Sequence, residues 1–236
     1  MAYYRNEIKY LVSEAQIVEL ECRLGGVLQA DSHARATGGA GSRSQYLLRS
    51  LYFDDYRNSC YEENLSGCDP REKWRIRIYG HSDETIYLER KSKVRGKTHK
   101  DRCPLTREQT MALIHGEDVP GVSQTYRADR LLREFLVKKN LRLFSPAVIT
   151  VYERIPYVYR LGNVRITLDR NISSSHDFEE FFDERIALRP VLPAGMHLLE
   201  VKYDEFLPTF IYQCLQMEGL RRTAFSKYCL CRRYGM

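Results

Sequence analysis

Basic residues alternate with apolar residues in several short segments of the chain. In the segment KWRIRIYG, Arg75 and Arg77 lie two residues apart, with an isoleucine between them. Successive side chains of a β-strand point to opposite faces, so both arginines share one face of the predicted strand. A guanidinium group grips a phosphate through two parallel hydrogen bonds. Exposure to water explains such a face, and so does a position facing an anionic ligand.

Four further segments repeat the pattern, with an apolar face opposite a face of acids and bases. A half-buried antiparallel sheet that exposes its polar face to water explains any one of them. Several predicted helices also need an apolar surface to pack on, so we expect the helices to cover the apolar faces. The charged faces then point into a barrel, where they must pair with each other, a metal or a polyanion. These faces carry Arg5, Glu7 and Lys9; Tyr87, Glu89 and Lys91; Arg165, Thr167 and Asp169; and Glu200 and Lys202.

Period-two patterns predict eight strands, mostly adjacent in sequence, which favours antiparallel pairing. Eight antiparallel strands can close into a barrel, and the predicted fold class is α+β. The predicted strands are Tyr4 to Val12, Leu47 to Phe53, Trp74 to Tyr79, Thr85 to Lys91, Val148 to Arg154, Val158 to Leu161, Val164 to Leu168 and Leu198 to Tyr203.

Two helices have clear start signals. Ser13 with Gln16, and Thr106 with Gln109, each form the sequence pattern of a capping box. Gly116 is positioned to end the second of these helices. Helical spacing predicts two more helices, over residues 124–140 and 207–219.

Composition limits the classes of function. Lys and Arg exceed Asp and Glu by 37 − 31 = 6, which is modest for a nucleic-acid binder but favours an anionic ligand where the cations converge. The seven cysteines include no CxxC pair, which predicts reduced thiols. A charged N-terminal segment and the absence of a long apolar stretch predict a cytoplasmic protein. We expect no nucleic-acid partner; export of a product would need a membrane protein partner supplied by another chain.

The motifs RSLYFDD, KWRIRIYG, YLERKSK with KTHKDR, RITLD, LEVKY and FSKY follow one another along the chain. In this order they resemble the catalytic domain of vacuolar transporter chaperone (VTC) proteins, a branch of the triphosphate tunnel metalloenzymes. The chain looks like a bacterial stand-alone member, from Lys9 to about Tyr228. The resemblance implies one domain over residues 1–236, built as a closed eight-stranded antiparallel barrel with helices packed outside.

The resemblance also implies an activity: synthesis of inorganic polyphosphate from ATP with Mn²⁺ or Mg²⁺. It places the metal on Glu200, although an ion pair with a neighbouring basic residue also explains that carboxylate. Arg5 departs from the wider superfamily, which often has a glutamate there, and Ala224 stands where eukaryotic members have a lysine. The implied catalytic and substrate-binding residues are Lys9, Arg75, Arg77, Lys91, Lys100, Arg154, Arg165 and Lys227, with Ser226 as a further phosphate contact.

Phosphoryl transfer requires positioning and charge neutralisation and needs no covalent nucleophile. The chain has no GxSxG segment and no P-loop, which agrees with such chemistry. Transfer to phosphate makes polyphosphate, whereas transfer to water makes the protein a tripolyphosphate or nucleoside triphosphate hydrolase. A polyanion receptor without turnover and an RNA-binding protein are two further hypotheses. The sequence leaves the acceptor and the oligomeric state open.

Overall fold

The computed structural model describes residues 6–31, 45–122 and 130–233. The described residues fall into two compact units. The first unit takes those within Met1–Leu47, Tyr152–Ile172 and Pro190–Ser226. The second takes those within Leu48–Val151, Ser173–Arg189 and Lys227–Met236.

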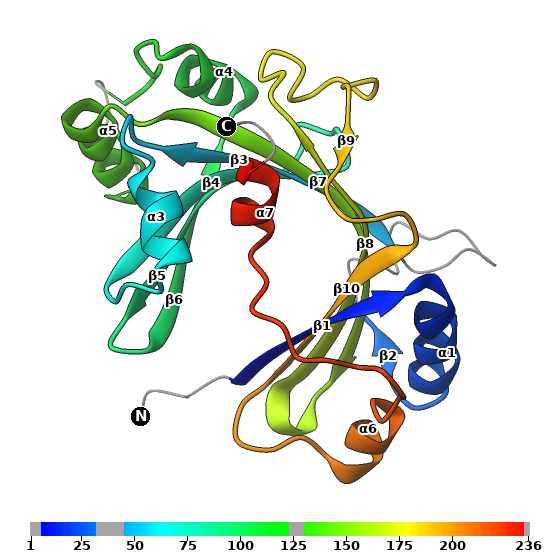
Figure 1. Ribbon diagram of the computed structural model, residues 1–236. Helices are drawn as coiled ribbons and strands as arrows, with labels where there is room; N and C mark the ends of the chain where they lie inside the picture. Colours follow the sequence, from blue (N-terminus) through cyan, green and yellow to red (C-terminus); the bar gives the residue numbers. More distant parts are fainter. Residues whose placement is uncertain (1–5, 32–44, 123–129, 234–236) are drawn as a thin grey trace. The chain divides into compact units, whose positions relative to one another are not determined.

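The first unit is built on a sheet in the strand order β1-β10-β8-β7, with β2 paired to β7 (Figure 1). β1 pairs antiparallel with β10, and β10 pairs antiparallel with β8. Helices α1 and α6 and the short helix η1 accompany these strands. The bounds are β1 Asn6–Ser13, α1 Glu14–Gly25, β2 Gln29–Ala30, β7 Ser145–Tyr159, η1 Leu161–Asn163, β8 Val164–Ser175, β10 Met196–Tyr203 and α6 Thr209–Cys214.

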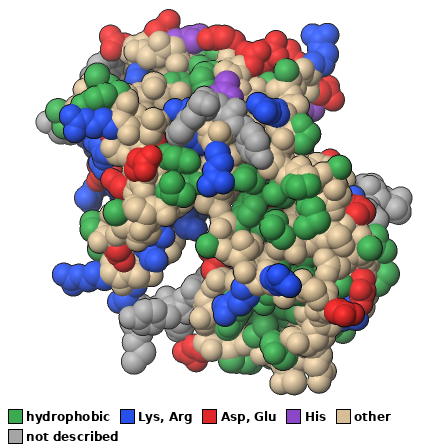
Figure 2. All heavy atoms as spheres, in the orientation of Figure 1, with side chains coloured by type: hydrophobic (Ala, Val, Ile, Leu, Met, Phe, Trp, Pro, Cys, Tyr) green, Lys and Arg blue, Asp and Glu red, His purple; other side chains and the backbone are tan. Residues whose placement is uncertain are grey.

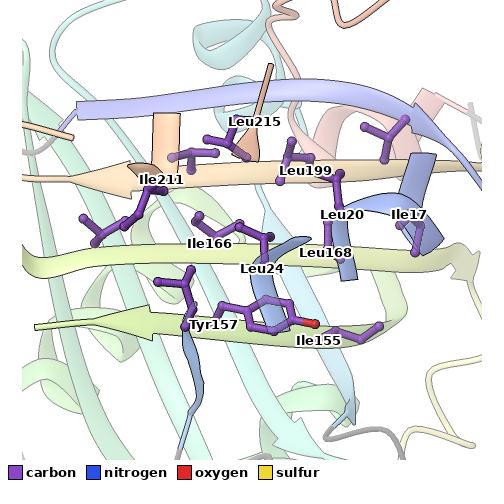
Figure 3. Packing of buried hydrophobic residues seen from close by; sticks show 14 residues of the cluster. Ile17, Leu20, Leu24, Ile155, Tyr157, Ile166, Leu168, Leu199, Ile211 and Leu215 are labelled. Atoms are coloured by element: carbon purple, nitrogen blue, oxygen red, sulfur yellow. The ribbon is translucent and has the colours of Figure 1, made fainter. Parts of the chain in front are cut away.

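Helix α1 covers the apolar face of this sheet. The capping box predicted at its start is confirmed: the Gln16 N–H donates to Ser13 Oγ, and the Ser13 N–H donates to Gln16 Oε1. Ile17, Leu20 and Leu24 are fully buried and pack with apolar residues of β7, β8 and β10 (Figure 3). Because strand side chains alternate, the acids and bases of these strands lie on the opposite face. The prediction that a helix covers the apolar face is confirmed in this unit.

The second unit continues the strand order as β7-β3-β4-β5-β6, and β9 pairs with β8. Phe135 of α5 anchors its core, with ring centroids 4.9 Å from Phe53 and 5.1 Å from Trp74. The capping box of α4 is confirmed, and Gly116 ends that helix with a φ of 81°. The bounds are β3 Tyr46–Asp54, α3 Ser59–Leu65, β4 Arg71–Tyr79, β5 Ile86–Val94, β6 Lys97–Leu105, α4 Arg107–His115, α5 Arg130–Arg142, β9 Arg189–Pro190 and α7 Lys227–Arg233.

The predicted closed eight-stranded barrel was wrong. Within the described residues the path of paired strands is open, ending at β1 and at β6. Another segment occupies the outer edge of β1, because Tyr10 bridges to Arg222 and the Thr223 N–H donates to the Lys9 carbonyl at 2.9 Å. β6 carries exposed lysines and Pro104, which are typical of strands that stay unpaired on one side.

Several boundaries also differ from the prediction. The strands predicted over 148–154 and 158–161 are one continuous strand, β7, and helices α3 and α7 and strand β6 were not predicted. The helix predicted over 207–219 is confined to α6. Residues 124–129 of another predicted helix lie outside the described residues, as do Arg5 and the start of the strand predicted from Tyr4. No helix in the described part of the chain is long and apolar enough to span a bilayer.

Candidate functional site

Three basic side chains converge on the buried carboxylate of Glu89 in the second unit. Arg75 donates to Glu89 Oε2 from Nε at 2.8 Å and from Nη2 at 2.7 Å. Lys100 Nζ lies 2.5 Å from Glu89 Oε1, and Arg77 Nη1 lies 3.9 Å from Oε2. The side chain of Glu89 is 3% exposed. We call Arg75, Arg77, Lys100 and Glu89 the Glu89 cluster.

The strand registers bring the Glu89 cluster together. Arg75 on β4 lies opposite Glu89 on β5, and Lys100 on β6 lies opposite Lys91 of β5. Burial opposes the ionisation of Glu89, but Arg75, Arg77 and Lys100 outweigh it and lower the pKa of Glu89 to about 2. Removal from water lowers the pKa of Lys100 to about 8, and the arginines add to this while Glu89 opposes it. The cations therefore outnumber the acid that holds them, which favours a polyanion.

A second group of charges surrounds Glu200 in the first unit. Glu200 Oε1 lies 3.6 Å from Lys9 Nζ and 3.2 Å from Lys202 Nζ, and Oε2 lies 3.9 Å from Arg154 Nη2. In register, Lys9 on β1 lies opposite Glu200 on β10. Lys9 Nζ is also 2.7 Å from Glu7 Oε1. We call Glu7, Lys9, Arg154, Glu200 and Lys202 the Glu200 cluster.

Arg154 is held mainly by another acid. It donates from Nε and Nη2 to the two oxygens of Asp169 at 2.6 and 2.7 Å, and Asp169 is fully buried. Burial opposes the charge on Arg154, but Asp169 outweighs it, so the pKa of Arg154 is raised. Arg165, on the same strand as Asp169, pairs with Asp31 at 2.8 Å and donates to the Tyr46 hydroxyl at 3.3 Å. Both predicted phosphate-binding arginines of this unit have acidic partners.

Thr167 lies directly opposite Glu200 in the register of β8 and β10. Thr167 is 3% exposed, and its hydroxyl oxygen is buried without a hydrogen-bond partner. Buried hydroxyls in folded proteins are nearly always paired, so an unpaired one asks for an explanation. A buried hydroxyl without a hydrogen-bond partner therefore lies beside the Glu200 cluster.

The Glu200 cluster can contribute to a metal site only together with phosphate. In the described part of the chain, no group of three or more His, Cys, Asp or Glu residues is arranged to hold a metal ion. Glu200 and Glu7 both approach Lys9 and offer carboxylate oxygens. Mg²⁺ is commonly bound by one or two carboxylates while substrate phosphates and waters complete its coordination. The donor set fits this mode, because hard oxygen ligands lie beside lysines that neutralise phosphate.

The model of the VTC domain family matches residues 4–234. The chain belongs to the VTC-domain family. This confirms the resemblance to VTC domains drawn from the ordered motifs. No curated protein matches the chain.

Solved structures resemble this VTC-domain chain distantly. The protein bh2851 from Bacillus halodurans is 12% identical, with 91% of this chain and 86% of that chain covered, at a TM-score of 0.49. PH1819 from Pyrococcus horikoshii OT3 is 13% identical, with 94% and 95% covered, at a TM-score of 0.45. PH1012 from the same organism is 12% identical, with 92% and 94% covered, at a TM-score of 0.44. At these TM-scores the likenesses assign neither function nor site.

The residues matched by VTC motifs fall into both units. Arg75, Arg77 and Lys100 meet in the Glu89 cluster, while Lys9, Arg154 and Glu200 meet in the Glu200 cluster. Lys91 is exposed on the same strand as Glu89. Ser226 closes the last segment of the first unit, and Lys227 begins α7 in the second. Their catalytic roles stay predictions.

Sequence reasoning assigned no role to Tyr52, although it contacts the Glu89 cluster. Its hydroxyl accepts a hydrogen bond from Arg75 Nη1 at 2.8 Å. The signal was present in the segment SLYFD, where Ser50, Tyr52 and Asp54 alternate with apolar residues as the arginines do. The motifs of this family emphasise basic residues, whereas the acceptors that orient them are neutral or acidic.

Proposed function

We propose that this VTC-domain protein is a metal-dependent polyphosphate polymerase that transfers the γ-phosphoryl group of ATP to a growing polyphosphate chain. The observation that carries the proposal is the convergence of Arg75, Arg77 and Lys100 on the buried Glu89. Such cations are fixed before substrate arrives, so little reorganisation is needed when phosphate oxygens replace the carboxylate as their partner. Family membership supplies the class of reaction.

The basic residues bind and orient phosphates in this proposal. Arg75 and Arg77 hold phosphate oxygens through their planar guanidinium groups, and Lys100 adds a mobile point charge. Lys9 and Lys202 neutralise further phosphates beside Glu200. Because the transition state of phosphoryl transfer is loose, holding donor and acceptor phosphates in line is the main task of these side chains.

Glu200, with Glu7 beside it, is the proposed holder of Mn²⁺ or Mg²⁺. A divalent cation bound there would draw negative charge away from the phosphate oxygens as ADP leaves. The acids of this cluster act as oxygen ligands, and the lysines set the charge balance around them.

Incubation of the full chain with ATP and Mn²⁺ tests the function. The proposal expects long phosphate polymers and ADP, resolved on a gel and by phosphorus NMR. Free phosphate as the sole product would instead support hydrolysis, and tight binding of polyphosphate without turnover would support a polyanion receptor. Arg133→Ala on α5 is a matched control for the arginine variants, since Arg133 is an exposed residue outside both clusters.

The expectation that the protein has no nucleic-acid partner is tested by competition between RNA and tripolyphosphate for the same protein sample. Basic and acidic side chains are interspersed on the face seen in Figure 2, which agrees with the modest net charge of +6. We expect RNA to compete poorly with tripolyphosphate at equal phosphate concentration. Displacement of tripolyphosphate by low concentrations of RNA would favour the RNA-binding hypothesis.

A further inference from the structure

One face of β3 carries a row of three polar side chains: Ser50, Tyr52 and Asp54. In register, Ser50 lies opposite Arg77 and Tyr52 lies opposite Arg75. Arg77 Nε donates to Ser50 Oγ at 3.2 Å, and Arg75 Nη1 donates to the Tyr52 hydroxyl at 2.8 Å. Each arginine of the Glu89 cluster therefore has an acceptor on β3 in addition to its acid on β5.

Asp54, the last member of the row, is 2% exposed and binds the C-terminal helix. Its carboxylate accepts the N–H groups of Cys60 at 2.8 Å and Tyr61 at 3.0 Å, at the start of α3. It also accepts the hydroxyl of Tyr228, which lies in the first turn of α7. Burial and the charge of Asp54 raise the pKa of Tyr228, which keeps this hydroxyl protonated as a donor.

Tyr228 in turn supports Tyr52. The two rings stack with centroids 4.9 Å apart and an interplanar angle of 27°. Both residues are buried, at 2% exposure for Tyr228 and 6% for Tyr52. Contacts therefore run without a gap from Asp54 through Tyr228 and Tyr52 to Arg75.

We propose that Tyr52 and Tyr228 are positioning residues that fix the Arg75 guanidinium for phosphate, so that helix α7 is a required support of the Glu89 cluster. Glu89 holds the Nε and Nη2 edge of Arg75, while Tyr52 holds Nη1. Acceptors on two different strands thus hold all three nitrogens of this guanidinium, which limits its motion more than Glu89 does alone. This inference rests on the proposed binding of phosphates by the Glu89 cluster.

The decisive variant is Tyr52→Phe, which keeps the ring stacked on Tyr228 and removes the acceptor of Arg75. Titration calorimetry of the full chain with tripolyphosphate and no metal should show about tenfold weaker binding, as expected for a lost bond to a charged group. Tyr228→Phe should weaken binding by a smaller factor, because it acts through Tyr52. Tyr61→Phe is the matched control, a buried tyrosine of the same unit whose ring contacts Tyr228, and should bind as the wild type does.

Coupling to Arg75 separates positioning from a general loss of structure. In an Arg75→Met background, Tyr52→Phe should cause no further loss of affinity, because position 75 then carries no donor for the Tyr52 hydroxyl. Additive losses would overturn the proposal. So would tyrosine variants that lower the melting temperature but bind tripolyphosphate like the wild type well below it.

A ligand-free measurement distinguishes this proposal from the proposed function. The Nη1–H signal of Arg75 in nitrogen-15 NMR should be protected from solvent exchange in the wild type and exchange faster in Tyr52→Phe, because Nη1 is the nitrogen that Tyr52 holds. If the wild type fails to bind tripolyphosphate, the proposed function falls while this signal still decides whether Tyr52 fixes Arg75. An Arg75 signal that Tyr52→Phe leaves unchanged would overturn the positioning role.

Discussion

Glu89 and Glu200 are buried carboxylates among basic side chains, but they are held differently. Arg75 and Lys100 approach Glu89 at 2.5–2.8 Å, whereas the ion pairs of Glu200 with Lys9, Lys202 and Arg154 span 3.2–3.9 Å. In the second unit the acid is the internal counter-ion of the arginines. In the first unit Asp169 is the close counter-ion of Arg154, and the ion pairs of Glu200 are longer.

An alternating pattern of charges on a strand therefore does not determine whether a given acid serves as an internal counter-ion or has another role. Both units follow the same pattern of apolar and charged faces. The difference arises from which acid lies within bonding distance of which arginine, and therefore from the neighbouring strands. Four substitutions or titrations test this division of roles.

The largest expected effect is on stability, from Arg154→Ala. This change removes two hydrogen bonds and the close cation from the buried Asp169, so the free energy of unfolding should fall by about 3–5 kcal/mol in a urea titration. The double variant Arg154→Met with Asp169→Leu should recover much of that loss, because both charges of the buried pair are then removed together. A loss of phosphate affinity with unchanged stability would place Arg154 among the substrate ligands instead.

Glu200→Gln should chiefly affect turnover. It keeps the side-chain shape but removes the charge proposed to hold the metal, so metal-dependent turnover should fall about a hundredfold or more. Metal-free binding of tripolyphosphate should survive or tighten, since a repelling carboxylate is gone. Glu89→Gln should instead lower the stability of the ligand-free protein, because three cations lose their counter-ion. If Glu200→Gln and Glu89→Gln lost the same amount of turnover and the same amount of stability, the two acids would not have different roles.

The pH dependence of binding should report on Lys100. Its pKa of about 8 lies below the ordinary lysine value of 10.5, so the folded protein loses this proton while the unfolded chain keeps it. Metal-free affinity for tripolyphosphate should therefore decline as the pH rises above 8. The free energy of unfolding of the ligand-free protein should rise with pH between 8 and 10.5, because the unfolded chain binds more protons there. Lys100→Arg should flatten the decline in calorimetric titrations. An identical decline in that variant would assign the titration to another group.

The smallest effect concerns the unpaired hydroxyl beside Glu200. Thr167→Val removes a buried group without a partner, so the ligand-free protein should gain about 1 kcal/mol in its free energy of unfolding. Thr150→Val is the matched control: Thr150 is fully buried and donates to the Ser50 carbonyl at 3.5 Å, so its loss should destabilise. Destabilisation by Thr167→Val of similar size would mean that its hydroxyl is paired in solution.

Local signals in the sequence predicted local structure well. In both capping boxes the two partners, Ser13 with Gln16 and Thr106 with Gln109, are three residues apart. The sequence pattern alone therefore predicts the hydrogen bonds. The open sheet was not predictable in this way, because closure depends on strand tilt and shear rather than on alternation. β6 was missed because its exposed run from Lys97 to Lys100 has no apolar face.

The candidate site was predictable as a set of residues but not as a set of contacts. The motifs identified Arg75, Arg77 and Arg154 as phosphate-binding candidates with equal weight. In the structure, Arg75 shares the acid Glu89 with Lys100, whereas Arg154 donates two hydrogen bonds to the buried Asp169. Such partners lie on neighbouring strands, and the register that unites them follows from turns and packing across the whole sheet.

The bond between Asp54 and Tyr228 has a consequence for the order of events during synthesis. The two residues are 174 positions apart, so Asp54 is synthesised roughly 9–35 s before Tyr228 at ordinary rates of translation. During that interval the N–H groups of Cys60 and Tyr61 are already at hand to satisfy the carboxylate. Asp54 of the nascent strand can thus be buried with these partners early. Tyr52 can stack on Tyr228 only after the C-terminal helix has been synthesised. We therefore expect the phosphate-binding geometry of Arg75 to form late, after β3, β4 and β5 have already folded.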